Sequence, residues 1–293
     1  MGGLITCGYI DINILFPILS GLFPVVCTYL LIKTKAKFIN FDFIFAFISS
    51  ASLSISLIPY LISKKLSKSS QSFNKSKEFN KFKKFLFIIM TSALDYIATL
   101  MYVFSNYNNI NLWFLDFFII GIFSRFILKT HLYRHHYFCI VVILICGLGL
   151  YIIQTLNFKP KYIDILKCIL FETTKSFGLV LNKYVMEYQF CSAYELCFYI
   201  GFFEMIFIGI FHIFFYFFKY NYINVWKEYN KMVNFKDICS IIIYCLIYFI
   251  YNLMYLIAIK KYNAFCSLII VSITEIGFIF LKLSKFGKFV FQL

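Results

Sequence analysis

The chain has 293 residues, of which 62% are hydrophobic and only 14% are charged. Soluble proteins carry about 25% charged residues, so this composition excludes an ordinary water-soluble domain. Lysine and arginine outnumber aspartate and glutamate by 28 to 13, and the excess lies mainly in short connections between apolar runs. Cations at membrane edges set topology and contact lipid headgroups, so we expect membrane lipid rather than nucleic acid as their partner.

Apolar runs of about twenty residues recur along the chain, and each is long enough to cross a hydrocarbon core of about 30 Å. We therefore predict an all-α, multi-pass integral membrane protein, and leave open whether its membrane is internal or the plasma membrane. Nine transmembrane helices are predicted, at residues 10–32, 41–62, 85–104, 110–128, 137–157, 163–184, 194–218, 237–259 and 263–283.

The longest connection, residues 63–84, carries eight lysines and a single glutamate. Its Ser, Asn and Lys residues bury too little apolar area to offset ordering, so we expect a disordered loop. The positive-inside rule places this loop on the cytosolic side of the membrane. The ten cysteines form no CxxC pair, and we interpret them as small buried residues rather than disulfides or metal ligands.

Polar residues near the middle of predicted helices are the candidate functional residues, because a charge there costs roughly 2.5–3.5 kcal/mol. Thr91, Asp95 and Thr99 recur every four residues and therefore share one helix face. Glu172 and Lys175 lie three residues apart and can form an ion pair within one helix. The predicted substrate pathway consists of Asp95, Thr91, Thr99, Glu172, Lys175, Glu204, Asn252 and Glu275.

A purely structural role stays open for most of these residues. The pair of Glu172 and Lys175 can neutralise itself within its helix, and Asn252 can serve interhelical packing. Glu204 and Glu275 can be protonated and hydrogen-bonded, because desolvation disfavours a charged carboxylate. Several acids in different helices together favour a polar pathway, since intramembrane ionisable groups normally face a bundle interior or a watery cavity.

The sequence HLYRHH at 131–136 matches the spacing of one histidine box of membrane di-iron enzymes. Those sites need several boxes, with about eight nitrogen ligands for two metals, and the whole chain has four histidines. Sequences of the GxSxG, Walker and GxGxxG types are also missing. We therefore expect no enzyme activity, no metal and no cofactor.

Six segments in a fixed order carry a resemblance to a known family. They are ALDYIATLMYVFSN (93–106), GIFSRFIL (121–128), GLGLYII (147–153), VLNKYVMEY (180–188), AYELCFYIGFF (193–203) and YNLMYLIAIKKYNA (251–264). Together they resemble helices three to nine of the EamA-like drug/metabolite transporter superfamily. The most similar group is the F branch of solute carrier family 35, the nucleotide-sugar-transporter-like branch.

The resemblance implies two inverted repeats, helices 1–5 in residues 1–157 and helices 6–9 in residues 158–293. The tail after residue 283 is too short to cross a membrane, so we expect the second repeat to lack its last helix. Inverted repeats place the substrate near the midplane at their interface. Some positions depart from the family: Asp116 lies in a helix where members often carry Arg and Gly, and Asn182 replaces an acidic residue.

The function that the resemblance implies is secondary-active transport of a small polar or anionic metabolite by alternating access. Asp95 would line the central cavity, and Lys175 would face an anionic substrate group. The departures from the family pattern keep one alternative open, a degenerate homologue or membrane scaffold that no longer transports. The sequence identifies neither the substrate nor a coupling ion, and it leaves a homodimer open.

Overall fold

The computed structural model describes residues 41–70, 81–104, 112, 114–158, 161–217 and 235–261. The predicted helices at 10–32 and 263–283, and with them Glu275, lie outside the described residues. All regular secondary structure in the described residues is helical. The helices are α2 (Phe41–Ser54), α3 (Leu57–Ser70), α4 (Lys81–Phe104), α5 (Phe114–Ile127), α6 (Arg134–Phe158), α7 (Tyr162–Tyr188), α8 (Ala193–Phe217) and α10 (Phe235–Lys261).

Four of the described helices are long and apolar enough to cross a membrane, which is consistent with the predicted integral membrane protein. Their qualifying stretches are Phe82–Met101, Arg134–Ile153, Ala193–Phe211 and Ile242–Lys261. With 27 residues, α7 is as long as α10, but it carries charged side chains near its middle. At 1.5 Å per residue, α7 reaches about 40 Å.

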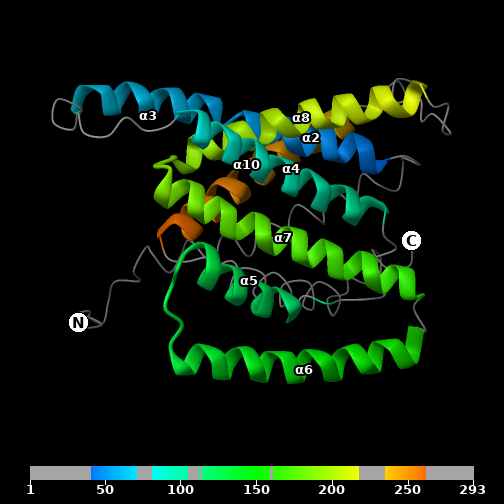
Figure 1. The fold of residues 1–293 in the computed structure, drawn as a ribbon. Coiled ribbons are helices and arrows are strands. Elements are labelled where there is room, and N and C mark those ends of the chain that lie inside the picture. Colours follow the sequence, from blue (N-terminus) through cyan, green and yellow to red (C-terminus); the bar gives the residue numbers. More distant parts are fainter. Residues whose placement is uncertain are drawn as a thin grey trace, which may run out of the picture.

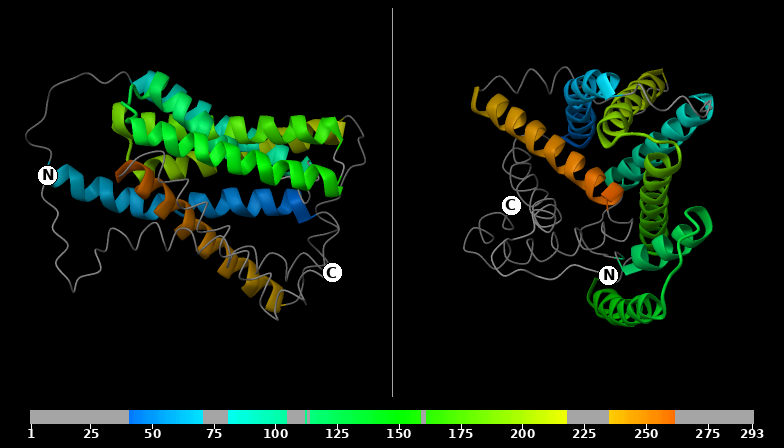
Figure 2. Two further views of the ribbon diagram at one scale, coloured as in Figure 1. Left: turned by 90° about the horizontal axis from the view of Figure 1, so that it is seen from below. Right: turned by 90° about the vertical axis from the view of Figure 1, so that its left-hand side faces the viewer.

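The described helices form a curved layer in the order α2, α8, α4, α7, α5 and α6 (Figure 1). Helix α6 lies at one edge of the layer and packs on α5. Helix α10 crosses one side of the layer at an angle and contacts α2, α8 and α7 (Figure 2). We call the side of the layer that α10 crosses its inner side, and the faces of α4, α7 and α8 on that side their inner faces. These inner faces therefore lie near α10.

Contacts along the helices fix their directions. Helices α4 and α8 run parallel, because Lys84 pairs with Glu195 and, farther along both helices, Tyr96 packs on Phe207. Ser50 of α2 bonds to Glu204 of α8, and Tyr60, later in the chain in α3, stacks on Phe198, which is earlier in α8. Because the order of the contacts is reversed, α2 runs antiparallel to α8.

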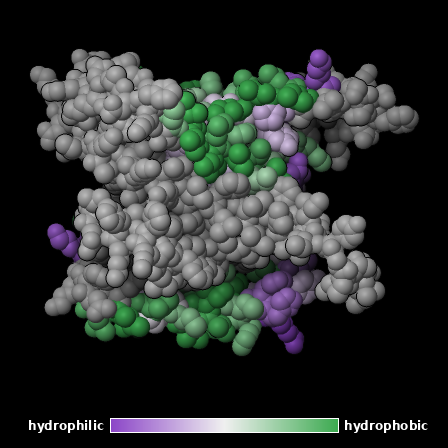
Figure 3. Space-filling view, turned by 180° about the vertical axis from the view of Figure 1, so that it is seen from behind, coloured by the Kyte–Doolittle hydropathy of each residue, from purple (hydrophilic) through white to green (hydrophobic). Residues whose placement is uncertain are grey.

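One end of the bundle collects cationic side chains, and we call it the basic end. Hydrophilic surface gathers there, while apolar side chains cover the described helices between the two ends (Figure 3). Both described borders of the predicted cytosolic loop lie at this end. Its described cations include Lys64, Lys65, Lys83, Lys84, Arg125, Lys129, Arg134, Lys183, Lys260 and Lys261.

The structure differs from the sequence prediction around residues 55–84. The predicted helix 41–62 is interrupted at Ile55 and Ser56, and α3 then continues to Ser70. Pro59 explains the break, because its ring nitrogen has no N–H to donate to the carbonyl of Ile55. The predicted loop 63–84 was therefore wrong at both ends, where α3 and α4 are helical, and residues 71–80 lie outside the described part of the chain.

Close packing of α2 on α8 depends on Gly201. An added Cβ there would lie 2.5 Å from Leu53 Cβ and 2.6 Å from the backbone oxygen of Ser50. Small residues allow helices in a membrane to approach this closely. The approach places the serines of α2 against the middle of α8.

We expect Gly201→Ala to destabilise the folded protein by about 1–3 kcal/mol, because the new methyl group meets backbone that cannot move aside. Gly209→Ala is the matched control in the same helix, since its added Cβ meets nothing within 4 Å. Thermal unfolding of both variants in detergent measures the difference. Equal unfolding temperatures would show that α2 and α8 are not in close contact.

Candidate functional site

Polar side chains from six helices meet near the middle of the bundle. Lys175 is the central residue of α7, Tyr248 is the central residue of α10, and Glu204 lies next to the centre of α8. Because helices of similar length cross the same thickness, these residues lie at similar depth. They belong to two clusters, one between α5 and α7 and the other between α2, α4, α8 and α10.

The Lys175 cluster consists of Asp116, Glu172, Lys175 and Ser176. The Nζ of Lys175 lies 2.8 Å from Asp116 Oδ2 and 3.2 Å from Glu172 Oε2. Ser176 donates a hydrogen bond of 2.6 Å to the other oxygen of Asp116. Asp116 is 1% exposed and Glu172 is 4% exposed, so the only described amine in the middle of the bundle holds two buried carboxylates.

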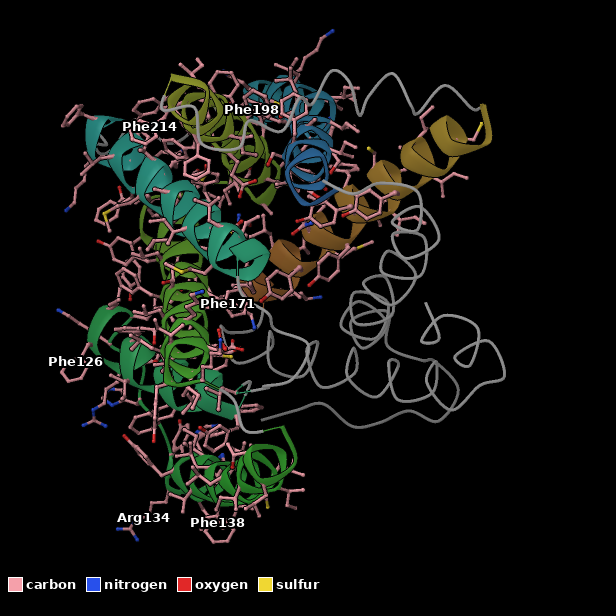
Figure 4. All side chains as sticks on the ribbon, turned by 90° about the vertical axis from the view of Figure 1, so that its right-hand side faces the viewer. Phe126, Arg134, Phe138, Phe171, Phe198 and Phe214 are labelled. Atoms are coloured by element: carbon pink, nitrogen blue, oxygen red, sulfur yellow. The ribbon has the colours of Figure 1, made fainter. Side chains whose placement is uncertain are left out.

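Lys175 also lies on the side of α7 that faces α10. Its Nζ is 5.5 Å from the centre of the Phe171 ring, and Phe171 projects from α7 toward α10 (Figure 4). In the same view, Phe126 and Arg134 point away from the bundle. Tyr255 of α10 lies near Lys175, and α10 contacts α7, so this cluster borders α10 as well as α5.

The predicted ion pair of Glu172 and Lys175 is confirmed, but the sequence prediction missed Asp116 as its third member. The described part of α5 begins at Phe114, and its first turn lies beside the middle of α7. In the sequence, Asp116 is only a departure from the family pattern within the predicted helix 110–128. The sequence signal that could have identified Asp116 is its position as an isolated acid inside the apolar stretch LWFLDFF at 112–118.

The Glu204 cluster consists of Ser50, Asp95, Glu204 and Tyr248. Ser50 donates a hydrogen bond of 2.9 Å to Glu204 Oε2, and Glu204 is 6% exposed. The carboxyl groups of Asp95 and Glu204 lie beside each other, and Tyr248 lies near both. Two carboxyl groups this close disfavour the ionisation of both at once.

Asp95 is an exposed residue although it lies on the inner face of α4. Thr91 and Ser92, on the same side of the helix, are buried by neighbouring helices. Met90 and Ile97 mark the outer face, where they are exposed. Asp95 is exposed as well, yet its carboxyl group contacts the buried Glu204. Asp95 therefore combines an exposed residue surface with a carboxyl group that packs against the bundle interior.

The other predicted pathway residues lie in less open positions. Thr91 donates to the carbonyl oxygen of Ile88 at 2.9 Å, and Asn252 Nδ2 donates to that of Tyr248, also at 2.9 Å. Each bond joins two residues of the same helix, so the hydrogen bond from Asn252 to Tyr248 does not connect two helices. Thr99 is half-buried one turn beyond Asp95.

A hydrogen-bonded network joins the helices at the basic end. Lys84 of α4 pairs with Glu195 of α8 at 2.7 Å. Lys183 of α7 donates to the backbone oxygen of Lys260, and Lys260 donates to that of Cys191, at 2.9 and 3.3 Å. Burial raises the pKa of the Cys191 thiol, which stays neutral inside this network. Four helix ends are thereby tied together.

The histidine sequence occupies the connection from α5 to α6 and the first turn of α6. The rings of His135 and His136 lie 4.1 Å apart, and Tyr133 stacks on His135. No group of three or more His, Cys, Asp or Glu side chains is placed to hold a metal ion within the described residues.

A scan against protein-family models finds no family that matches the chain, and a search of the curated proteins finds no relative. The function is therefore inferred from the geometry of the two clusters. That geometry is a set of ionisable groups at mid-depth between helices, in which the exposed residue Asp95 contacts the buried Glu204.

Proposed function

We propose that the chain is a secondary-active transporter of a small polar metabolite. The observation that carries this proposal is the exposed Asp95 at mid-depth, in contact with buried Glu204 on the inner face of the bundle. Charges inside a membrane are costly, and they are retained mainly along substrate or ion paths. The four acids are more than helix packing requires, because apolar residues of similar size would pack without that cost.

The packing of the helices supports a fold of two inverted repeats. In such a fold each predicted helix of the first repeat corresponds to the predicted helix five places later in the chain. The second and third predicted helices contain α2 and α4, and the seventh and eighth are α8 and α10. Helix α2 therefore corresponds to α8, and α4 corresponds to α10. The contact of α4 with α8 should then have a counterpart between α10 and α2, and both contacts are present. The contact between α2 and α8 corresponds to itself. The two clusters lie at this interface, where inverted repeats bind substrate.

The network at the basic end supports alternating access. Lys84 and Glu195 connect a helix of the first proposed repeat with one of the second, and the bonds of Lys260 add α7 and α10. While these bonds close the basic end, a substrate would reach the central residues from the opposite end of the bundle. Rocking of one repeat against the other would break these few bonds and open the basic end.

Uptake into proteoliposomes tests the proposal. Vesicles with the wild-type chain are incubated with a mixture of small polar metabolites, and their contents are quantified by mass spectrometry. We expect at least one metabolite to accumulate over protein-free vesicles, and Asp95→Asn to lower its uptake roughly tenfold by removing a charge from the path. The matched control is Asp164→Asn, at the start of α7 and away from both clusters.

Two outcomes would contradict the proposal in different ways. If no metabolite accumulates with the wild-type protein, the alternative of a non-transporting membrane homologue becomes the better account. If a metabolite accumulates equally with Asp95→Asn, the chain transports but Asp95 is not part of the path.

A further inference from the structure

The charge of the central residues restricts what the proposed path can carry. In the middle of the described helices, four carboxyl groups, those of Asp95, Asp116, Glu172 and Glu204, accompany the single amine of Lys175. Lys175 is bonded to two of these carboxylates at 2.8 and 3.2 Å. An anionic substrate group would have to displace a buried carboxylate from Lys175, which leaves that carboxylate unpaired.

Both clusters hold more acidic than basic groups. The Lys175 cluster has two acids for one amine, and the Glu204 cluster has two acids, Asp95 and Glu204, and no amine. A carboxylate without a counter-charge is unfavourable in a low-dielectric interior, so these acids take up either a proton or a cation, and they repel an anion. The site described above therefore favours a cation over an anion.

A ladder of tyrosines on α10 connects the two clusters and is a second, independent observation. Consecutive rings of Tyr244, Tyr248, Tyr251 and Tyr255 have centroids 5.6, 6.4 and 5.8 Å apart. Tyr248 interacts with the Glu204 cluster and Tyr255 with Lys175. Aromatic faces beside carboxylates bind organic cations, because the negative face of the ring attracts the positive charge.

An unused hydrogen-bond acceptor lies along the same side of α7. Asn182 Oδ1 is buried, has no hydrogen-bond partner in the described structure, and belongs to a residue that is 9% exposed. Asn182 follows Lys175 by seven residues, or two helical turns, so both lie on one face of α7. A buried acceptor without a donor is unfavourable, and an N–H group of a bound ligand would satisfy it.

We propose that the central site takes a small organic cation, such as a protonated amine, rather than an anion. This inference rests on the proposed function and names its substrate class. The carboxyl groups supply the counter-charge, the tyrosine ladder supplies aromatic faces, and Asn182 supplies a hydrogen-bond acceptor.

The charge preference can be measured without knowing the substrate. Thr99→Cys places a thiol one turn beyond Asp95 and leaves every charge in place. Reconstituted protein is treated with a cationic or an anionic methanethiosulfonate of similar size, and modification at position 99 is quantified by peptide mass spectrometry. Each rate is divided by the rate for a free thiol in water. We expect the normalised rate for the cation to exceed that for the anion roughly tenfold.

Asp95→Asn combined with Thr99→Cys should lower this ratio, whereas Asp164→Asn combined with Thr99→Cys should leave it unchanged. A ratio of one or below would overturn the cation preference and leave the proposed transporter intact. No reaction with either reagent would overturn both, because position 99 would then not border an accessible path.

Discussion

Replacing Lys175 with methionine is expected to destabilise the folded protein by about 3–5 kcal/mol. Methionine keeps most of the side-chain volume but removes the charge that Asp116 and Glu172 share at 2.8 and 3.2 Å. Both carboxylates are almost fully buried, so neither can replace the lost ion pair with water. The free energy of unfolding in mixed detergent micelles, or the unfolding temperature, measures this loss.

Two further variants separate the loss of the ion pair from the loss of a lysine. Lys167→Met changes a lysine near the start of α7, outside the cluster, and should cost less than about 0.5 kcal/mol. The triple variant Asp116→Asn, Glu172→Gln, Lys175→Met removes all the charges together and should recover much of the stability. If Lys175→Met is no less stable than Lys167→Met, the three charged groups do not form a buried cluster.

The sequence predicts the helices far better than their pairing. Periodic apolar runs predicted α6, α8 and α10 within a few residues of their observed ends. The break after α2 was missed because a single proline inside an apolar run also fits an unbroken helix. The helix over 63–70 was missed because its lysines and serines contain no apolar periodicity.

For the candidate site, local pairs were predictable and distant pairs were not. Glu172 and Lys175 pair within one helix, so their spacing alone predicts the contact. The contact of Asp116 with Ser176 joins residues sixty positions apart and depends on where α5 begins. The contact of Ser50 with Glu204 depends on the close approach that Gly201 allows. Neither packing detail can be read from hydrophobicity.

The most direct test of a water-accessible path is the reactivity of thiols on the two faces of α4. Asp95→Cys and Ile97→Cys lie two residues apart and at nearly the same depth. The residue at 95 is on the inner face, and the residue at 97 is 40% exposed on the outer, apolar face. Thiols react as thiolates, which hardly form in contact with lipid.

Labelling of reconstituted protein with a charged, membrane-impermeant methanethiosulfonate, quantified at each position by peptide mass spectrometry, gives the two rates. We predict that the thiol at position 95 reacts on the order of a hundredfold faster than the thiol at position 97, because water reaches only the inner face. Equal protection of both positions would contradict a polar path through the bundle and would favour a purely structural role for Asp95 and Glu204.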